Sequence, residues 1–313
     1  MRVLITGGAG FIGANLSKHL VERGHELVVL DDLSTGSRDN LAGVPARLVE
    51  GTILSASDLD AVMDGVDSVV HLAARPSVPR SIQDPMASHL VNATGTVEVL
   101  EAVRRAGSQR ERPAQVIVAS SSSVYGANPT LPKREDLAPR PVSPYAASKL
   151  ATESYAIAWG ASFGMDVLAV RFFNVFGPLQ TAGHAYAAVV PAFVDAALAG
   201  RPLPVHGDGT QSRDFTYVGS VCTILCDAIA RRVSDAEPVN LAFGSRVTLL
   251  EVVAQLQAII GHDLELDHHP VRAGDVPHSQ ADTTRLRSLF PDVEAVPLVA
   301  GLASTVDWFR SGR

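Results

Sequence analysis

The sequence predicts an α/β fold: a doubly wound parallel sheet together with a smaller domain of mixed α/β structure. Three observations support this prediction. Short, continuously apolar runs alternate with amphipathic stretches through the first half of the chain, a glycine-rich turn follows the first run, and an acidic pair ends the second. Because strands that are apolar on both faces belong to parallel sheets covered by helices on both sides, the alternation indicates that architecture.

The first half of the chain carries this alternation from element to element. Continuously apolar runs predict strands, and the periodic stretches between them predict helices. The expected strands are 2–6, 26–32, 46–51, 67–74, 115–121 and 166–174, and the expected helices are 14–24, 55–65, Met86 to Ala106 and Pro144 to Phe163.

Beyond Gly177 the composition changes, with more Pro, His and Gly and with elements of mixed type, so we place a domain boundary there. The larger domain is expected to comprise residues 1–176 plus roughly 215–243, and the smaller domain residues 177–214 and 244–313. In this half we expect helices near Ala187 to Leu198, near Gly219 to Arg232, over 248–260 and at the C-terminus, with strands over 237–243 and 263–269.

Composition narrows the class of protein. The 313 residues, 46% hydrophobic and only 19% charged, are enough to bury one large core or two unequal lobes. A net charge of -7, with no block of Lys or Arg, argues against a nucleic-acid or anionic-membrane surface.

No apolar run is long enough to span a bilayer and the N-terminus does not resemble a secretory signal, so we expect a cytoplasmic protein. Cys222 and Cys226 share one helix face and are expected to be buried free thiols.

The stretch TGGAGFIG follows the first strand directly and opens the first helix. Gly7, Gly10 and Gly13 let the backbone turn tightly, approach a pyrophosphate and pack the helix close to the sheet. The phosphate is expected at the helix N-terminus, where free N–H groups and the helix dipole favour an anion. Asp31, which with Asp32 ends the second strand, is expected to accept hydrogen bonds from the adenosine ribose and to repel a 2′-phosphate, which favours NAD over NADP.

A run of four serines, Ser120 to Ser123, follows a buried strand, and Tyr145 and Lys149 lie four residues apart on one face of the next helix. A tyrosine with its ordinary pKa of about 10 needs help to act as a base at neutral pH, and a nearby ammonium supplies it. Ligands of open α/β sheets bind at the carboxyl edge of the strands, so these side chains are expected to form one site.

With these motifs the chain resembles the extended short-chain dehydrogenase/reductases, and within them the NAD-dependent nucleotide-sugar epimerases. The resemblance rests on TGGAGFIG, DDLSTG, HLAA, SSSSVYG, YAASK, RFFNVFGP, GDGTQSRDF and RAGDVPHSQAD, which span nearly the whole length. It implies that the larger domain is a Rossmann domain that binds NAD and that the smaller one binds a UDP-sugar. The implied reaction inverts C4 of a UDP-hexose through a 4-keto intermediate. A homodimer through the helices around 97–103 and 147–158 is implied as well.

The resemblance also assigns the catalytic residues. Tyr145 takes the proton from the sugar 4-hydroxyl while hydride passes from C4 to NAD. Lys149 lowers the tyrosine pKa and holds the nicotinamide ribose, and Ser121 hydrogen-bonds O4 and shares its proton. Ser122 and Ser123 border the sugar. Related dehydratases carry Asp-Glu at those two positions, so a 4,6-dehydratase is disfavoured.

The same resemblance supplies the expected contacts. The cofactor-binding set is Gly7, Gly10, Phe11, Ile12, Gly13, Asp31, Asp32, Ser34, Thr35, Gly36, Thr52, Ile53, Leu72, Ala73, Ala74, Asn92, Tyr145, Lys149 and Phe172. The substrate-binding set is Ser77, Val78, Ser121, Ser122, Ser123, Tyr145, Phe173, Asn174, Ala188, Val189, Val205, His206, Arg213, Arg272 and Ser279. Within these sets Arg213 and Arg272 clamp the UDP diphosphate, a task that suits the arginine fork. Thr52 stands where relatives usually place an adenine-contacting Asp.

Four positions bear on the choice of sugar. Ser279 aligns with a family position at which a bulky tyrosine restricts the pocket to unsubstituted hexoses, so the serine leaves room for a 2-acetamido group. This favours UDP-GlcNAc/UDP-GalNAc and/or UDP-glucose/UDP-galactose. Arg75 and Arg80 keep UDP-glucuronate open as an alternative, whereas Thr181 stands where glucuronate epimerases tend to carry an arginine.

The sequence leaves two other interpretations open. A catalytically idle NAD-binding sensor or scaffold is the alternative from another class, and the complete proton-transfer set argues against it. His262, His268 and His269 with Asp267 suggest a metal site, but neighbouring residues of a strand point to opposite faces. We therefore expect no metal.

Overall fold

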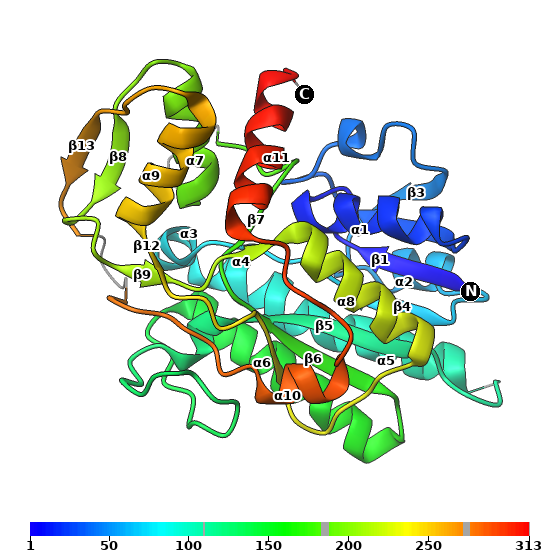
Figure 1. Ribbon diagram of the computed structural model, residues 1–313. Coiled ribbons are helices and arrows are strands. Elements are labelled where there is room, and N and C mark those ends of the chain that lie inside the picture. The colour runs from blue at the N-terminus through cyan, green and yellow to red at the C-terminus, as the bar shows by residue number, and fades with distance from the viewer. Residues whose placement is uncertain (109, 183–187, 272–275, 313) are drawn as a thin grey trace.

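The computed structural model describes residues 1–108, 110–182, 188–271 and 276–312. Its centre is a seven-stranded parallel sheet in the order β11-β6-β5-β4-β1-β2-β3 (Figure 1). The strands are β1 (Arg2–Thr6), β2 (Glu26–Asp31), β3 (Ala46–Glu50), β4 (Ser68–His71), β5 (Gln115–Ser121), β6 (Val167–Phe172) and β11 (Val239–Leu241). The strand order reverses between β1 and β4, the kind of position at which open α/β sheets bind their ligands. The predicted doubly wound fold is confirmed.

Helices cover both faces of the sheet because alternate strand residues point to opposite sides. On one face, α1 (Phe11–Glu22) and α8 (Val218–Arg231) pack on a core that includes Val3 and Ile5 of β1. On the other face, α2 (Ala56–Val62), α5 (Gly95–Gly107) and α6 (Pro144–Phe163) pack on a core that includes Leu4. The loops at the carboxyl ends of the strands are therefore the part of this unit that can reach a ligand.

The helical segment that ends in α5 changes its winding on the way. α4 (Pro85–His89) passes into a π-helical turn, η2 (Leu90–Thr94), which continues directly into α5. Within this turn the Asn92 carbonyl accepts two side-chain hydroxyls, from Thr96 at 2.6 Å and from Thr152 of α6 at 2.8 Å. The long helix predicted from Met86 is confirmed, and the π turn inside it was not foreseen.

The smaller lobe packs three helices around one core, α7 (Val189–Leu198), α9 (Leu249–Ile260) and α11 (Leu298–Arg310). In Figure 1 the strands β8 (Leu203–His206) and β13 (Leu266–His269) lie at the upper left, away from the main sheet. Three strand pairs belong to this half: β8 (Leu203–His206) with β13 (Leu266–His269), β9 (Ser212–Arg213) with β12 (Val247–Thr248), and β7 (Val175–Phe176) with β10 (Thr216–Tyr217). The remaining short elements are η1 (Arg38–Leu41), α3 (Val78–Gln83), η3 (Ser122–Tyr125) and α10 (Thr284–Leu289).

The expected elements lie within a few residues of those observed, and β5 and α6 have the predicted bounds. The structure adds α3 and α10, which at six residues each are too short for helical periodicity to reveal. The buried free thiols predicted for Cys222 and Cys226 are confirmed, and burial raises the pKa of both. In the described part of the chain, none of the helices has the length and apolar character that a membrane span requires. The division into two domains stays a prediction.

Candidate active site

The loop between β1 and α1 is built from glycines that leave little room for side chains. A Cβ at Gly7 would lie 2.6 Å from the Ala73 nitrogen, and one at Gly13 would lie 2.4 Å from the Gly7 carbonyl oxygen. A Cβ at Gly10 would meet only that same oxygen, at 3.3 Å, among the non-neighbouring atoms described, so the space before α1 is open. Gly10 caps α1 without a side-chain bond, which leaves the N–H groups of the first turn available to an anion.

Asp31 ends β2 beside this loop. Its buried carboxylate accepts the backbone N–H groups of Ala9 and Leu33, both at 2.8 Å. Burial raises the pKa of Asp31, and the two backbone bonds act against that rise. A carboxylate has about four acceptor positions, so Asp31 retains capacity for ribose hydroxyls. The glycine loop, the open helix end and this carboxylate together fit a dinucleotide.

His71, the last residue of β4, connects the strands on both sides of the point where the strand order reverses. Its Nδ1 lies 2.7 Å from Thr6 Oγ1, and its Nε2 lies 3.1 Å from Thr96 Oγ1. Because Thr96 donates its own proton to the Asn92 carbonyl, Nε2 carries the ring proton and Nδ1 accepts from Thr6. Burial, and then the charge of Lys149, lowers the pKa of His71 to about 3, so the ring is neutral.

Asn92 ties the loop after β4 to α6. Its side-chain oxygen accepts the Arg75 N–H at 2.7 Å, and its Nδ2 donates to the Arg75 carbonyl oxygen at 3.3 Å and to Ser148 Oγ at 2.9 Å. Asn92 is 0% exposed. It therefore holds the backbone at Arg75 against α6, and the cofactor contact expected for Asn92 stays a prediction.

The end of β5 brings Ser121 to Tyr145 in the first turn of α6. The Ser123 N–H donates to Ser121 Oγ at 3.2 Å, so the proton of the Ser121 hydroxyl is free for another partner. The Ser121 side chain lies close enough to the Tyr145 phenol to act against the rise in its pKa. Ser81 of α3 accepts the backbone N–H of Tyr145 at 3.0 Å, which fixes the start of α6 from the other side. The predicted serine and tyrosine are thus in contact.

Lys149 lies one turn further along α6, where its buried ammonium donates to the Ala119 carbonyl oxygen at 2.8 Å. Burial lowers the pKa of Lys149 to about 8. Burial also raises the pKa of Tyr145, and the hydrogen bond with Ser121 opposes that rise. The lowering of the tyrosine pKa by Lys149, expected together with the charge of bound NAD, stays a prediction. Desolvation of the phenol is the larger effect, and the ammonium is bonded to the backbone of β5.

Behind the serines, a buried ion pair joins α6 to β6. Glu153 accepts from Arg171 Nη2 at 2.6 Å and from Nε at 3.0 Å, and each residue is 2% exposed. Ser120 Oγ also donates to Glu153, at 2.6 Å, and Arg171 donates to the Tyr125 hydroxyl at 2.8 Å. The pair holds the strand end that presents the site serines against the helix that presents the site lysine.

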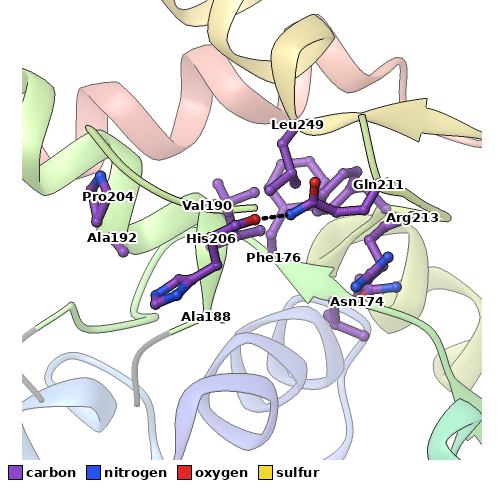
Figure 2. Close-up of a pocket in the computed structure, with 13 residues that line it drawn as sticks. Asn174, Phe176, Ala188, Val190, Ala192, Pro204, His206, Gln211, Arg213 and Leu249 are labelled. Atoms are coloured by element: carbon purple, nitrogen blue, oxygen red, sulfur yellow. Dashed lines mark hydrogen bonds between the residues drawn. The ribbon is translucent and has the colours of Figure 1, made fainter. Parts of the chain in front are cut away.

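A cavity of about 200 Å³ lies where β7 meets the smaller lobe (Figure 2). Figure 2 shows Arg213 near Asn174, and Gln211 bonded to the carbonyl oxygen of His206. Predicted substrate residues in its wall are Asn174, Ala188, Val189, His206 and Arg213, and unpredicted ones include Phe176, Pro204, Gln211, Phe215 and Leu249. The cavity therefore gathers residues from segments that are distant in sequence.

Other predicted substrate residues lie outside this cavity. Phe173 and Val205 are 0% exposed, so they shape the site from behind without reaching its surface. Ser279 is 7% exposed, and its N–H donates to the Ser212 carbonyl oxygen at 3.0 Å. Arg272 lies outside the described residues.

Two of the predicted contact residues hold strained backbone. Ser77 has a φ of 140° and Asn174 a φ of 35°, values that residues with side chains rarely adopt. Such conformations cost about 1–3 kcal/mol each and are found mostly at ligand sites. Ser77 Oγ accepts the Arg80 N–H at 3.3 Å, and Asn174 Nδ2 donates to the Asp214 carbonyl oxygen at 3.3 Å. These bonds help to hold both residues in place.

Arg75 and Thr52, which depart from the family pattern, each interact with other residues of the chain. The Arg75 guanidinium lies 3.9 Å from the Asp84 carboxylate, so one of the arginines considered for a sugar carboxylate already has an acidic neighbour. Thr52 donates its N–H to Asp58 at 2.9 Å, and its hydroxyl oxygen accepts the Leu54 N–H at 3.2 Å. The Thr52 hydroxyl proton remains available for a ligand.

His206 lies on β8, and His268 and His269 lie on its partner strand β13. The rings of His206 and His269 are 5.2 Å apart, and His269 Nε2 lies 3.1 Å from the Asp267 carboxylate. Among the described residues, no group of three or more His, Cys, Asp or Glu side chains is placed to hold a metal ion.

Sequence reasoning missed the residues that hold the site side chains in position, namely His71, Ser81, Ser148, Glu153, Arg171 and Asp214. One usable signal was present: Glu153 follows Lys149 by four residues and so shares its helix face. Another was Arg171 in an otherwise apolar strand, because a buried guanidinium requires an acidic partner. The sequence alone does not identify that acidic partner.

Comparison with known proteins gives a family match over most of the chain. The model of the NAD dependent epimerase/dehydratase family matches residues 3–242. The chain is 37% identical over 320 residues, covering 99% of both proteins, to the UDP-glucose 4-epimerase of Mycolicibacterium smegmatis.

Solved structures agree with this match. The UDP-N-acetylglucosamine 4-epimerase from Methanobrevibacter ruminantium M1, in complex with UDP-N-acetylmuramic acid, has a TM-score of 0.93 at 32% identity and covers 100% of this chain and 99% of its own. The UDP-glucose 4-epimerase from Thermotoga maritima, with UDP-glucose, has a TM-score of 0.92 at 32% identity, with the same coverage. The likeness therefore extends over both the sheet and the smaller lobe.

Proposed function

The chain belongs to the NAD-dependent epimerase/dehydratase family and is an NAD-dependent UDP-sugar 4-epimerase, and from this premise we propose that its substrates are UDP-GlcNAc/UDP-GalNAc and/or UDP-glucose/UDP-galactose. The observation that carries the proposal is the arrangement of Ser121 at the end of β5, Tyr145 in the first turn of α6 and Lys149 one turn further along α6. An NAD-binding sensor or scaffold would not need this proton-transfer set.

NAD, when bound, supplies the reversible oxidation and reduction of the sugar C4. The residues of this chain fit NAD both at its diphosphate and adenosine ribose and at its nicotinamide ribose. The open N-terminus of α1 at Gly10 is proposed to hold the diphosphate, and Asp31 to accept the adenosine ribose hydroxyls. Lys149 is proposed to donate to the nicotinamide ribose. At pH 7 it is largely protonated, since its pKa is about 8.

The proton chemistry falls to Tyr145 and Ser121. Tyr145 is proposed to take the proton of the sugar 4-hydroxyl as the phenolate, which the Lys149 ammonium and bound NAD would favour, and to return it in the second half of the reaction. Ser121 is proposed to pass a proton between O4 and that phenol. The Ser123 N–H occupies one acceptor position of Ser121 Oγ, which aims its own proton toward the tyrosine.

Epimerisation is favoured over dehydration by what stands next to Ser121. A 4,6-dehydration removes water from C5 and C6, which requires an acid and a base at that end of the sugar. Ser122 and Ser123 occupy the two positions, and a serine hydroxyl is a poor substitute for a carboxyl pair. This supports a reaction that returns the hydrogen to C4.

The size of Ser279 supports an N-acetylated substrate. The residue is 7% exposed. It lies on the segment 276–283 before α10, called the strap, whose backbone is held to β9 through the Ser212 carbonyl oxygen. A small side chain on a fixed backbone leaves space that a large one would fill. UDP-glucuronate is the second candidate. It ranks lower because the Arg75 guanidinium lies beside the Asp84 carboxylate.

We also propose that the protein is a homodimer through α5 and α6. Tyr155, Trp159 and Phe163 form a row of edge-to-face rings along α6, with centroids 5.9 and 5.7 Å apart. Tyr155 and Phe163 are 42% and 48% exposed in one chain, and rows of exposed aromatic rings are enriched in subunit interfaces. Sedimentation equilibrium tests this proposal. A purely monomeric protein at micromolar concentration would contradict it.

A product assay tests the proposed function. The pure protein with added NAD is incubated separately with UDP-GlcNAc, UDP-galactose and UDP-glucuronate, and the UDP-sugars are separated by chromatography. We expect the 4-epimer of UDP-GlcNAc, of UDP-galactose or of both. Turnover of UDP-glucuronate alone would replace the proposed substrates with the alternative, and no turnover of any of the three would defeat the proposal.

A further inference from the structure

Three segments of the chain meet at one buried carboxylate, that of Asp214. Its Oδ2 accepts the Gly244 N–H at 2.9 Å and the Ala281 N–H at 3.1 Å, and its Oδ1 accepts the Ser245 hydroxyl at 2.8 Å. The residue is 0% exposed. One side chain therefore connects the strand end at Arg213 with the loop after β11 and with the strap before α10.

The segments joined in this way carry residues proposed to contact the substrate. Arg213 directly precedes Asp214 and lies in the wall of the cavity. Ser279 lies two residues before Ala281 on the same strap, and its N–H is bonded to Ser212 on the other side of Arg213. The Asp214 backbone also serves the site, because its carbonyl oxygen accepts the Asn174 side chain.

Further hydrogen bonds also link the strap, the loop after β11 and the strand β9 to one another, and these three segments are called the frame. Gln280 Nε2 donates to the Gly244 carbonyl oxygen at 2.9 Å, so the strap and the loop also bond to each other. β12 pairs with β9 at Arg213, which holds the loop from its other end. Asp214 is the group in this frame that contacts the loop, the strap and the site strand at once.

Burial of this carboxylate is unfavourable by itself, and the bonds it accepts offset part of that cost. Burial raises the pKa of Asp214, while the bonds from Ala281, Ser245 and Gly244 act in the other direction. A buried polar group is stable only when its hydrogen-bonding partners are in place. The geometry of the three donors is thus fixed by the acceptor they share.

We propose that Asp214 is a positioning residue for substrate binding: its carboxylate fixes the backbone that carries Arg213 and Ser279 around the UDP-sugar, an assignment that rests on the proposed function. Asp214 does not touch the reacting atoms. Its loss is expected to weaken the binding of the UDP part while leaving the chemistry at Ser121 and Tyr145 largely intact.

Asparagine is the sharpest replacement, because it keeps the size of the side chain and changes its bonding. An amide has one oxygen and one NH2 group, and every partner described for the carboxylate is a donor. One orientation of Asp214→Asn sets the NH2 group against the Gly244 and Ala281 N–H groups, and the other turns it toward the Ser245 hydroxyl, which must then accept where it donated; in neither orientation does a bond to a charged acceptor remain. Ser245→Ala is a milder variant, which removes a single donor from the same carboxylate.

The experiment measures kcat and KM for UDP-galactose, and the Kd of UDP by calorimetry, on the NAD-loaded enzyme. For Asp214→Asn we expect both KM and the Kd of UDP to rise about tenfold, since a lost bond to a charged acceptor is worth more than about 1.4 kcal/mol. kcat and NAD content are expected to stay within about twofold of the parent protein. For Ser245→Ala we expect a rise in KM of about threefold.

Asp166→Asn is the matched control. Asp166 is a partly buried carboxylate bonded to Arg112 and Arg232, and it precedes β6 at the opposite edge of the sheet from the site. It is expected to lower the melting temperature without changing KM.

The outcomes separate the two proposals. An unchanged KM and an unchanged Kd of UDP in Asp214→Asn would overturn the positioning role, as would a fall in kcat with no change in KM. If Asp214→Asn does not fold, Ser245→Ala decides, and an unchanged KM in that variant would overturn the role. If the parent protein binds UDP but does not convert UDP-galactose, UDP-GlcNAc or UDP-glucuronate, the proposed function fails and the comparison of Kd values still tests Asp214. A parent protein that does not bind UDP would overturn both.

Discussion

Glu153→Gln probes the buried ion pair behind the catalytic serines. The substitution keeps the shape of the side chain and one acceptor oxygen, but it removes the charge that faces Arg171. Arg171 would keep its bond to the Tyr125 hydroxyl and its position 4.7 Å above that ring. The guanidinium, which is 2% exposed, would then remain buried without a counter-charge.

The magnitude follows from that burial. Removing one partner of a buried ion pair costs about 3–5 kcal/mol. The bonds that Arg171 retains place the expected cost near the lower end, at about 3 kcal/mol. For a chain of 313 residues such a loss lowers the melting temperature by about 5 °C. Because Ser120 also donates to Glu153 and precedes Ser121, we expect kcat to fall as well.

Differential scanning calorimetry measures this effect, with Glu50→Gln as the control. Glu50 pairs with Arg38, but both side chains are more than half exposed, at 57% and 59%. Exposed pairs contribute about 0–1 kcal/mol, so this control is expected to change the melting temperature little. Equal shifts for the two variants would refute the reasoning, because burial is the only property that distinguishes the pairs in this argument.

Three further predictions concern the site itself. Tyr145→Phe is expected to retain NAD and UDP binding while activity falls by about 10²–10⁴-fold, measured by product chromatography, and activity close to the parent's would mean that another group takes the proton. Ser279→Tyr is expected to abolish turnover of UDP-GlcNAc and to spare that of UDP-galactose, and equal loss of both would refute the size argument. Burial lowers the pKa of Lys149 to about 8 from 10.5, so between these values the unfolded chain holds a proton that the folded chain has released. Stability from this group therefore rises with pH across that window by about 3 kcal/mol, and denaturant unfolding at pH 8 and pH 10 should show the rise in the parent but not in Lys149→Met.

The fold could be predicted from the sequence because the patterns that indicate it are local. Continuously apolar strands, amphipathic helices of ten residues or more and a glycine turn at the first strand end each depend on neighbours along the chain. The same is true of Tyr145 and Lys149, whose separation by one helical turn places them together on α6. Site residues that sit on such elements were predicted with their partners.

The parts that could not be predicted depend on contacts between distant segments. Ser81 reaches Tyr145 from a short helix that has no periodic signal, and Asp214 bonds residues 30 and 67 positions away. The burial of Asn92 against Arg75 and Ser148 is likewise a property of the packed structure. The direction of the Tyr145 pKa is likewise a balance between desolvation and hydrogen bonding from the Ser121 side chain, which no spacing along the chain determines.

The π turn at Leu90–Thr94 has a consequence for the rotational phase of the helices that it joins. Each residue added to or removed from a helix turns everything beyond it by about 100°. α4 exposes Met86, at 64%, whereas α5 buries Val99, Leu100 and Val103 against the sheet. Deleting a single residue from the turn would restore ordinary winding but rotate one helix against the other, so that α5 could bury its apolar face only by moving α4 away from Ser81 and the start of α6. This segment is therefore expected to accept substitutions more readily than any change in its length.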